Sequence, residues 1–308
     1  MAAMRCMSAT SSTNPGRAAA AVRRRTLAAL VAALVAGLAL ASAPAIAAAG
    51  LDKATAVPHL GARGQAGYRD FLAAEPHRAF AIAPGGGWGW SQAAASPDAA
   101  LEQALAACQQ HTRQRCVPYA LNADTVFDAR AWPRLWRPYA TAAEARRASV
   151  GTDRGQRFPD LLLTAPDGKP LKLSELRGKV VVLHFWATWC PTCRLELPQF
   201  ETLRRGFAGR RDIVFLFTQA REPAEVSRKW LKQQGLGLVL HDSGARGSRD
   251  ERFRLADGQT LADRQVAAVF PATYVLDRHG VVVFGLKGSA EDWGEYVPFL
   301  KDLLSHAK

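Results

Sequence analysis

Apolar positions in the second half of the chain gather into runs of strand length, separated by segments with helical spacing. Residues 180–186 read Val-Val-Val-Leu-His-Phe-Trp, a nearly continuous apolar run that is typical of a central strand buried on both faces. A second buried strand is expected at 212–218. Two more strands are expected at 272–276 and 281–286, and the polar residues between them predict a hairpin. These four segments are the expected strands of one central sheet.

Helices are expected between and after these strands. Their ranges are 191–206 with a kink at Pro198, 223–234 ending at Gly235, and 292–305. Shorter expected elements are a strand at 158–164, an extended stretch at 171–173, a helical turn at 174–179 and a short strand at 238–240. Strand, helix and strand followed by a hairpin and a final helix form the thioredoxin arrangement. The pattern therefore predicts an α/β thioredoxin-like domain at 156–308, with a central mixed sheet and helices on both faces.

A smaller α+β module is expected before this domain, at residues 50–142. Its expected strands are 79–83, 88–91 and 116–122, and its expected helices are 68–72 and 98–110. Cys108 falls at the end of the second helix and Cys116 at the start of the third strand, so one disulfide would connect helix to sheet. A second redox pair is the weaker alternative, because this spacing places neither sulfur at a helix N-terminus.

The N-terminal residues 1–49 have the pattern of a secretory signal peptide. Three arginines at 23–25 precede an apolar run through Leu40, and small residues follow at 45–47. An uncleaved membrane anchor is the alternative. Cleavage would remove Cys6, and export of the remaining four cysteines to an oxidising compartment favours disulfides. Residues 143–155 are polar, include two glycines and are expected to form a linker.

The charge of the chain argues against a nucleic-acid-binding protein. Its 308 residues include 40 Lys and Arg against 27 Asp and Glu, a formal net charge of +13. Five of the arginines lie in residues 1–50, which hold no acid, so +8 remains for the rest. The basic residues are scattered among acids rather than clustered on one face, as a nucleic-acid footprint requires. The excess is interpreted as a solvated surface with a mild attraction to anionic membranes.

The run Trp189-Cys190-Pro191-Thr192-Cys193 carries the candidate chemistry. It follows a predicted buried strand and opens a predicted helix. Unpaired backbone N–H groups and the helix dipole at that position favour the thiolate, which is the attacking species in thiol–disulfide exchange. Cys190 is therefore expected to have a lowered pKa and to be the nucleophile. Cys193, one turn later, is expected to be the more buried, resolving thiol.

Other uses of a Cys-x-x-Cys pair find less support in the sequence. A zinc site needs a second ligand pair, and none follows, so neither a metal nor another cofactor is expected. Haem attachment needs a histidine at 194, where this chain has Arg194. Peroxiredoxins share the fold but place Pro and Thr where this chain has Leu183 and Ala187. A purely structural disulfide remains the alternative, and the strand–CxxC–helix context favours redox function over it.

Three stretches resemble the TlpA/ResA family of periplasmic thioredoxin-like proteins. Residues 185–198 read Phe-Trp-Ala-Thr-Trp-Cys-Pro-Thr-Cys-Arg-Leu-Glu-Leu-Pro and resemble its active site. Residues 158–180 resemble its lead-in, and 270–280, beginning Phe-Pro-Ala-Thr-Tyr, resemble its proline segment. The resemblance covers about 150 residues. The earlier Gly-Trp-Gly-Trp stretch at 87–90 with Cys108 resembles a small module of exported bacterial proteins, from which no function can be transferred.

The family resemblance implies roles for three further residues. Pro271 is implied to be cis and to lie beside the sulfurs, exposing neighbouring backbone to a substrate strand. Glu196 matches an acidic residue that tunes the thiols, with a solvated helix charge as the alternative. His184 departs from the family pattern: it could accept the proton of Cys193, although a core histidine is favoured. The polar stretch 242–269 is longer than in the family and could shape the choice of partner.

The resemblance implies an exported, periplasmic thiol–disulfide oxidoreductase with Trp189 flanking its dithiol. Reduction of disulfides in exported proteins is expected, with apocytochromes c and copper-site proteins as candidate substrates and a membrane thiol transporter as electron donor. A disulfide-forming oxidant or isomerase of the same fold is an alternative. A non-catalytic protein in which the first module binds a partner is another.

Overall fold

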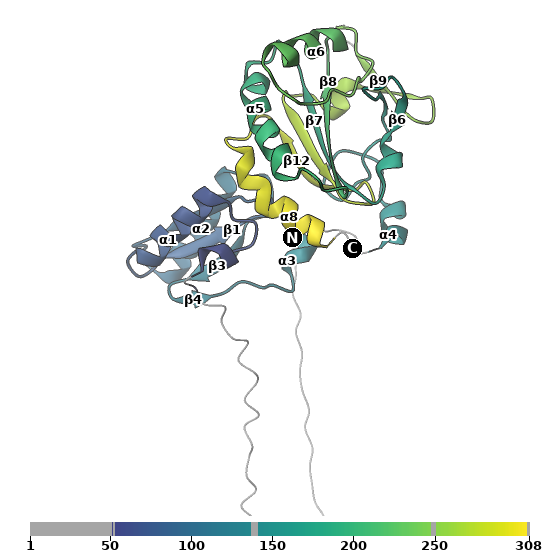
Figure 1. The fold of residues 1–308 in the computed structure, drawn as a ribbon. Helices are drawn as coiled ribbons and strands as arrows, with labels where there is room; N and C mark the ends of the chain where they lie inside the picture. Colours follow the sequence, from purple (N-terminus) through teal and green to yellow (C-terminus); the bar gives the residue numbers. More distant parts are fainter. Residues whose placement is uncertain (1–50, 52, 137–140, 248–250, 307–308) are drawn as a thin grey trace, which may run out of the picture. The chain divides into compact units, whose positions relative to one another are not determined.

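The structure is a computed structural model that describes residues 51, 53–136, 141–247 and 251–306 (Figure 1). The expected signal peptide at 1–49 lies outside the described residues. All described residues belong to one compact unit. Within these ranges, no helix is long and apolar enough to cross a membrane.

The first module is a four-stranded antiparallel sheet with helices packed against it. Its strand order is β2-β1-β3-β4. The strands are β1 (Ala79–Ile82), β2 (Trp88–Ser91), β3 (Val117–Leu121) and β4 (Asp124–Thr125), and the helices are η1 (Ala54–Ala56), α1 (Ala62–Ala73), α2 (Pro97–Gln110) and α3 (Trp132–Trp136). The predicted helix at 68–72 is the second half of the longer α1. The predicted strands and the predicted second helix are present with ends shifted by a residue or so.

Side chains of β1 alternate between two cores, as the period of a strand requires. Phe80 and Ile82 face a large aromatic cluster, whereas Ala79 and Ala81 pack against α2. The α2 side holds small residues because the backbones approach closely there. A Cβ atom placed on Gly89 of β2 would lie 2.2 Å from the Cys108 nitrogen. The glycine between the two tryptophans is therefore required by the packing of α2.

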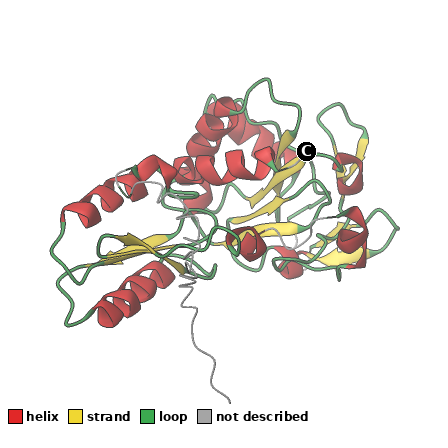
Figure 2. Ribbon diagram, turned by 90° about the horizontal axis from the view of Figure 1, so that it is seen from below, coloured by secondary structure: helices red, strands yellow, loops and turns green. Residues whose placement is uncertain are grey.

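The second sheet has strand order β12-β11-β7-β8. Its strands are β7 (Val180–Trp186), β8 (Ile213–Gln219), β11 (Ala272–Leu276) and β12 (Val282–Lys287). Only the β7–β8 pair is parallel. The helices of this part are η2 (Leu173–Leu176), α5 (Pro191–Gly206), α6 (Ala224–Gln233), α7 (Asp263–Val266), η3 (Trp293–Tyr296) and α8 (Val297–Ser305). This is the predicted thioredoxin-like fold, and Figure 2 shows its strands in yellow among the helices in red.

Both faces of β7 are buried, which explains its continuous apolar sequence. Val182 and Trp186 face a core that includes α5 and α8, and Val181 and Phe185 face a second core. The second core is covered by the segments around β5 (Leu162–Thr164), β6 (Pro170–Lys172) and β9 (Arg252–Arg254). Figure 1 shows α5 on one side of this sheet and β6 and β9 on the other.

The structure departs from or adds to the predicted elements in four places. The strand expected at 158–164 is reduced to β5, because Phe158 and Leu161 fill the core from irregular backbone. The strand expected at 238–240 is a single bridge between Phe217 and Leu240. The expected linker begins with helix α4 (Ala142–Arg147), whose N-terminus is capped reciprocally by Thr141 and Glu144. The long stretch 242–269 contains the hairpin β9–β10 (Thr260–Ala262) and α7.

Candidate active site

Cys190 lies at the junction between strand and helix that the sequence predicts. Strand β7 ends at Trp186, and Cys190 is the N-cap residue of α5. The backbone N–H of Cys193 donates to the Sγ atom of Cys190 over 3.2 Å, and the Thr192 hydroxyl lies 3.4 Å from the same sulfur. The positive end of the helix dipole adds to these contacts. Negative charge on the Cys190 sulfur is therefore stabilised by local backbone geometry.

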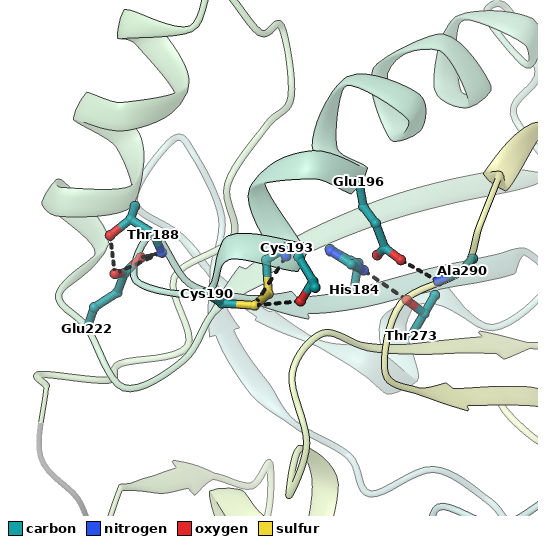
Figure 3. The surroundings of a disulfide bond; sticks show 9 residues. His184, Thr188, Cys190, Cys193, Glu196, Glu222, Thr273 and Ala290 are labelled. Atoms are coloured by element: carbon teal, nitrogen blue, oxygen red, sulfur yellow. Dashed lines mark hydrogen bonds between the residues drawn. A yellow bond between two sulfur atoms is a disulfide. The ribbon is translucent and has the colours of Figure 1, made fainter.

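The two cysteines differ in access to solvent. They form a disulfide in this structure, with Cα atoms 5.3 Å apart. Cys190 retains 4% exposure, while Cys193 is completely buried. Figure 3 shows Glu222 on the side of Cys190, and His184 and Glu196 on the side of Cys193. An incoming disulfide can reach only the Cys190 sulfur without a movement of the helix.

Glu196 is a buried carboxyl group one turn along α5 from Cys193, with only 2% exposure. Burial raises its pKa to about 7, and hydrogen bonds from the Trp293 side chain and the Ala290 backbone N–H partly offset this rise. The alternative of a solvated helix charge is therefore excluded by the structure. A carboxyl group with this pKa exchanges protons readily at neutral pH.

His184 is completely buried in β7. Its Nδ1 atom lies 2.9 Å from the Thr273 hydroxyl, and its ring packs against Phe200 with centroids 4.3 Å apart. Burial lowers the pKa of His184 to about 3, so the imidazole is neutral at physiological pH. Such a weakly basic imidazole is poorly suited to accept the proton of Cys193. The geometry favours the core-histidine interpretation.

Pro271 directly precedes β11 and is buried. The Phe270–Pro271 peptide bond is cis, as the family resemblance implies. The Phe270 ring meets the Trp189 ring edge to face, with centroids 5.2 Å apart. Trp189 and Val269 are each about half exposed, at 50% and 52%. Two exposed apolar side chains therefore lie on the segments that directly precede Cys190 and Pro271.

Two residues that sequence reasoning missed hold these loops. Glu222, 5% exposed, accepts hydrogen bonds from both the backbone N–H and the hydroxyl of Thr188. Arg221 places its guanidinium over the Phe270 ring at 4.9 Å. Both residues follow β8, the parallel neighbour of β7. Because the carboxyl ends of parallel strands meet at one edge, residues directly after β8 were candidates for contact with the CxxC loop.

The other cysteine pair is not part of this site. Cys108 and Cys116 form a disulfide with Cα atoms 6.2 Å apart. They pack with the alanines between α2 and the module's sheet, whereas Cys190 and Cys193 belong to the large core. Among the described residues, no group of three or more His, Cys, Asp and Glu side chains is placed to hold a metal ion.

Comparison with known proteins places the second part of the chain among redox proteins. A family model described as Redoxin matches residues 153–293. The thioredoxin-like protein YneN of Bacillus subtilis is 32% identical over 149 residues, which cover 48% of this chain and 77% of that protein. The thiol-disulfide oxidoreductase ResA of Bacillus thuringiensis is 26% identical over 129 residues, which cover 42% of this chain and 66% of that protein.

The chain also aligns with a solved structure. The crystal structure of a thiol:disulfide interchange protein of the thioredoxin family from Chlorobium tepidum aligns with 47% of this chain and 94% of its own. Its TM-score is 0.34 and its sequence identity 23%.

Proposed function

The chain belongs to the TlpA/ResA-like thioredoxin superfamily and is a thiol–disulfide oxidoreductase; we propose that it reduces disulfides in exported proteins. The observation that supports the exchange activity is the asymmetry of the pair. The Cys190 sulfur accepts a helix N–H and retains exposure, whereas Cys193 is buried behind it. A nucleophile and a resolving thiol need this difference.

The reaction takes place in two exchanges. The Cys190 thiolate attacks one sulfur of a substrate disulfide, the substrate S–S bond breaks, and the second substrate sulfur leaves as a thiolate. Cys193 then loses its proton to the Glu196 carboxylate and attacks the Cys190 sulfur. The substrate leaves with two thiols, having gained two electrons, and the enzyme retains the Cys190–Cys193 disulfide. A donor dithiol restores the reduced enzyme by the reverse exchange.

Export is part of the proposal. The Cys108–Cys116 disulfide suits an oxidising compartment, and the N-terminal residues have a signal-peptide pattern. A periplasmic reductant of this kind needs a membrane thiol transporter as its electron donor. Exported proteins with exposed disulfides, apocytochromes c among them, are its proposed substrates.

An insulin-reduction assay tests the activity. The protein, reduced with dithiothreitol, should accelerate precipitation of the insulin B chain, and Cys190→Ser should abolish the acceleration. Absence of activity in the unmodified protein, or full activity in the variant, would overturn the proposal.

The reduction potential tests the direction. A value near −270 mV, about that of thioredoxin, is expected of a reductant. A value near −120 mV, about that of the strongest disulfide-forming oxidants, would replace reduction with the oxidant alternative.

A further inference from the structure

Two loops meet beside Cys190, where Trp189 contacts Phe270, and consecutive residues of the β8–α6 turn hold one loop each. The CxxC loop, residues 187–190, joins β7 to α5. The proline loop, residues 267–271, leads into β11. These loops are about 80 residues apart in the sequence and share no hydrogen bond that the described residues show. The pairing of Phe185 with Ala272 brings the ends of the two loops together, and the β8–α6 turn adds side-chain contacts to both.

Glu222 holds the CxxC loop. The Thr188 backbone N–H lies 2.9 Å from Oε1 and 3.1 Å from Oε2, and the Thr188 hydroxyl donates to Oε2 over 2.6 Å. The Ser227 hydroxyl of α6 donates to Oε1 as well. A buried carboxylate with this many donors is fixed in position. Thr188 is two residues before Cys190, so the carboxylate locates the backbone that leads to the nucleophile.

Arg221 holds the proline loop. Its guanidinium forms an ion pair with Asp263, whose side chain is 1% exposed, and donates to the Ala267 carbonyl over 3.3 Å. The same plane covers the Phe270 ring, which in turn meets Trp189. A planar guanidinium suits this combination of forked donation and stacking, which a lysine cannot reproduce. The backbone of Arg221 has φ +56°, a conformation that residues other than glycine rarely adopt. The many contacts of the Arg221 side chain stabilise this unfavourable backbone conformation.

We propose that Arg221 and Glu222 are positioning residues that together fix the gap between the CxxC loop and the proline loop. By fixing this gap they give the enzyme its preference for protein disulfides over small disulfides. The inference rests on the proposed function and concerns the same site. A small disulfide needs only the Cys190 sulfur. A disulfide within a polypeptide must also lay its chain along the proline loop, so it needs both loops at the correct separation.

The selectivity ratio measures this role. It is kcat/KM for insulin reduction divided by kcat/KM for the small disulfide 5,5′-dithiobis(2-nitrobenzoate), determined with the reduced protein. Glu222→Gln loses one acceptor for Thr188, and Arg221→Lys keeps the charge facing Asp263 but loses the plane over Phe270. Each variant should lower the ratio about tenfold, mainly through a higher KM for insulin, because small displacements of reacting groups have effects of at least this size.

The Glu222→Asp variant distinguishes the effect of the carboxylate's position from the effect of its negative charge. It keeps the negative charge but shortens the side chain by one methylene, so the Thr188 contacts are lost. The positioning role predicts a lower ratio here too. A ratio equal to that of the unmodified protein would mean that Glu222 acts through its charge alone, which would overturn the proposal.

Glu201→Gln is the matched control. Glu201 is another buried carboxylate, 6% exposed, but it accepts from Arg204 and Arg205 on α5 and contacts neither loop. The selectivity ratio of the Glu201→Gln variant should stay within twofold of that of the unmodified protein. A matching fall in this control would show that the effect is general destabilisation and overturn the proposal.

The remaining outcomes are also decisive. If Glu222→Gln and Arg221→Lys both fold and both have selectivity ratios within twofold of that of the unmodified protein, the positioning proposal is overturned as well. If one of these does not fold, as judged by circular dichroism, the other decides. An unmodified protein that fails to reduce insulin would instead refute the proposed function.

Discussion

Glu196 offers a quantitative test of the electrostatics beside the dithiol. Burial raises the pKa of this carboxyl group from 4.5 to about 7 in the folded, oxidised protein. The folded state therefore binds the proton more tightly than the unfolded state does. Stability from this group is fully present below pH 4.5 and is lost as the pH rises through about 7. At about 1.4 kcal/mol for each pKa unit, the full loss is about 3 kcal/mol.

Replacement of Glu196 by Gln removes this titration and keeps an acceptor for the Ala290 N–H. Urea unfolding of the oxidised protein at pH 5 and pH 8 measures the effect. Most of the loss of stability develops between these pH values. From pH 5 to pH 8, the free energy of unfolding of the unmodified protein should therefore fall by about 2–3 kcal/mol more than that of Glu196→Gln. Contributions of other titrating groups cancel in this comparison. Parallel losses in the two proteins would refute the raised pKa and, with it, the proton-acceptor role of Glu196.

Three further predictions concern other residues. Replacement of both Cys108 and Cys116 by Ser should lower the free energy of unfolding by about 2–3 kcal/mol, the value for a loop of this length, and leave insulin reduction intact; loss of reduction would assign that pair to catalysis. His184→Asn should leave the shape of the pH profile of exchange between pH 5 and pH 9 unchanged, because burial holds the pKa of His184 near 3; a shifted profile would contradict its neutral core role. His59→Ala should destabilise the fold by about 3 kcal/mol, because it removes two hydrogen bonds and a ring that packs against aromatic side chains. A decrease in the free energy of urea unfolding of less than about 1 kcal/mol would contradict this.

The sequence predicted the strands that decide the fold. Strand β7 has the expected bounds, because buried β-branched and aromatic residues on both faces produce one continuous apolar run. The position of Cys190 at a helix N-terminus followed from Pro191 and the preceding strand. These features are local, so a pattern of neighbouring residues is enough to predict them.

Features that depend on distant contacts were not predictable in this way. Leu238 and Leu240 are buried by tertiary packing, but Val239 is 46% exposed and only one bridge forms there. The hairpin β9–β10 is held by short polar strands with a single buried side chain, Phe253, which gives little periodicity. Helix α3 has five residues, and its two tryptophans are buried against His59.

In the candidate site too, some features follow from neighbouring residues and others depend on distant contacts. The cysteine pair is visible in the sequence, but the burial of Glu196 depends on the loop at Ala290, 94 residues away. The contact between Thr188 and Glu222 spans 34 residues and exists because β7 and β8 are parallel neighbours. Only the folded chain brings these carboxylates to the two sides of the disulfide.

Trapping of the mixed disulfide tests whether Cys190 is the attacking thiol. The reduced Cys193→Ser variant is incubated with a disulfide-containing peptide, and the product is mapped by mass spectrometry. A peptide joined to Cys190 is expected in this variant, with little or no adduct in Cys190→Ser. A peptide joined to Cys193 in Cys190→Ser at a comparable rate, or no adduct on Cys190, would contradict the assignment of Cys190 as the attacking thiol.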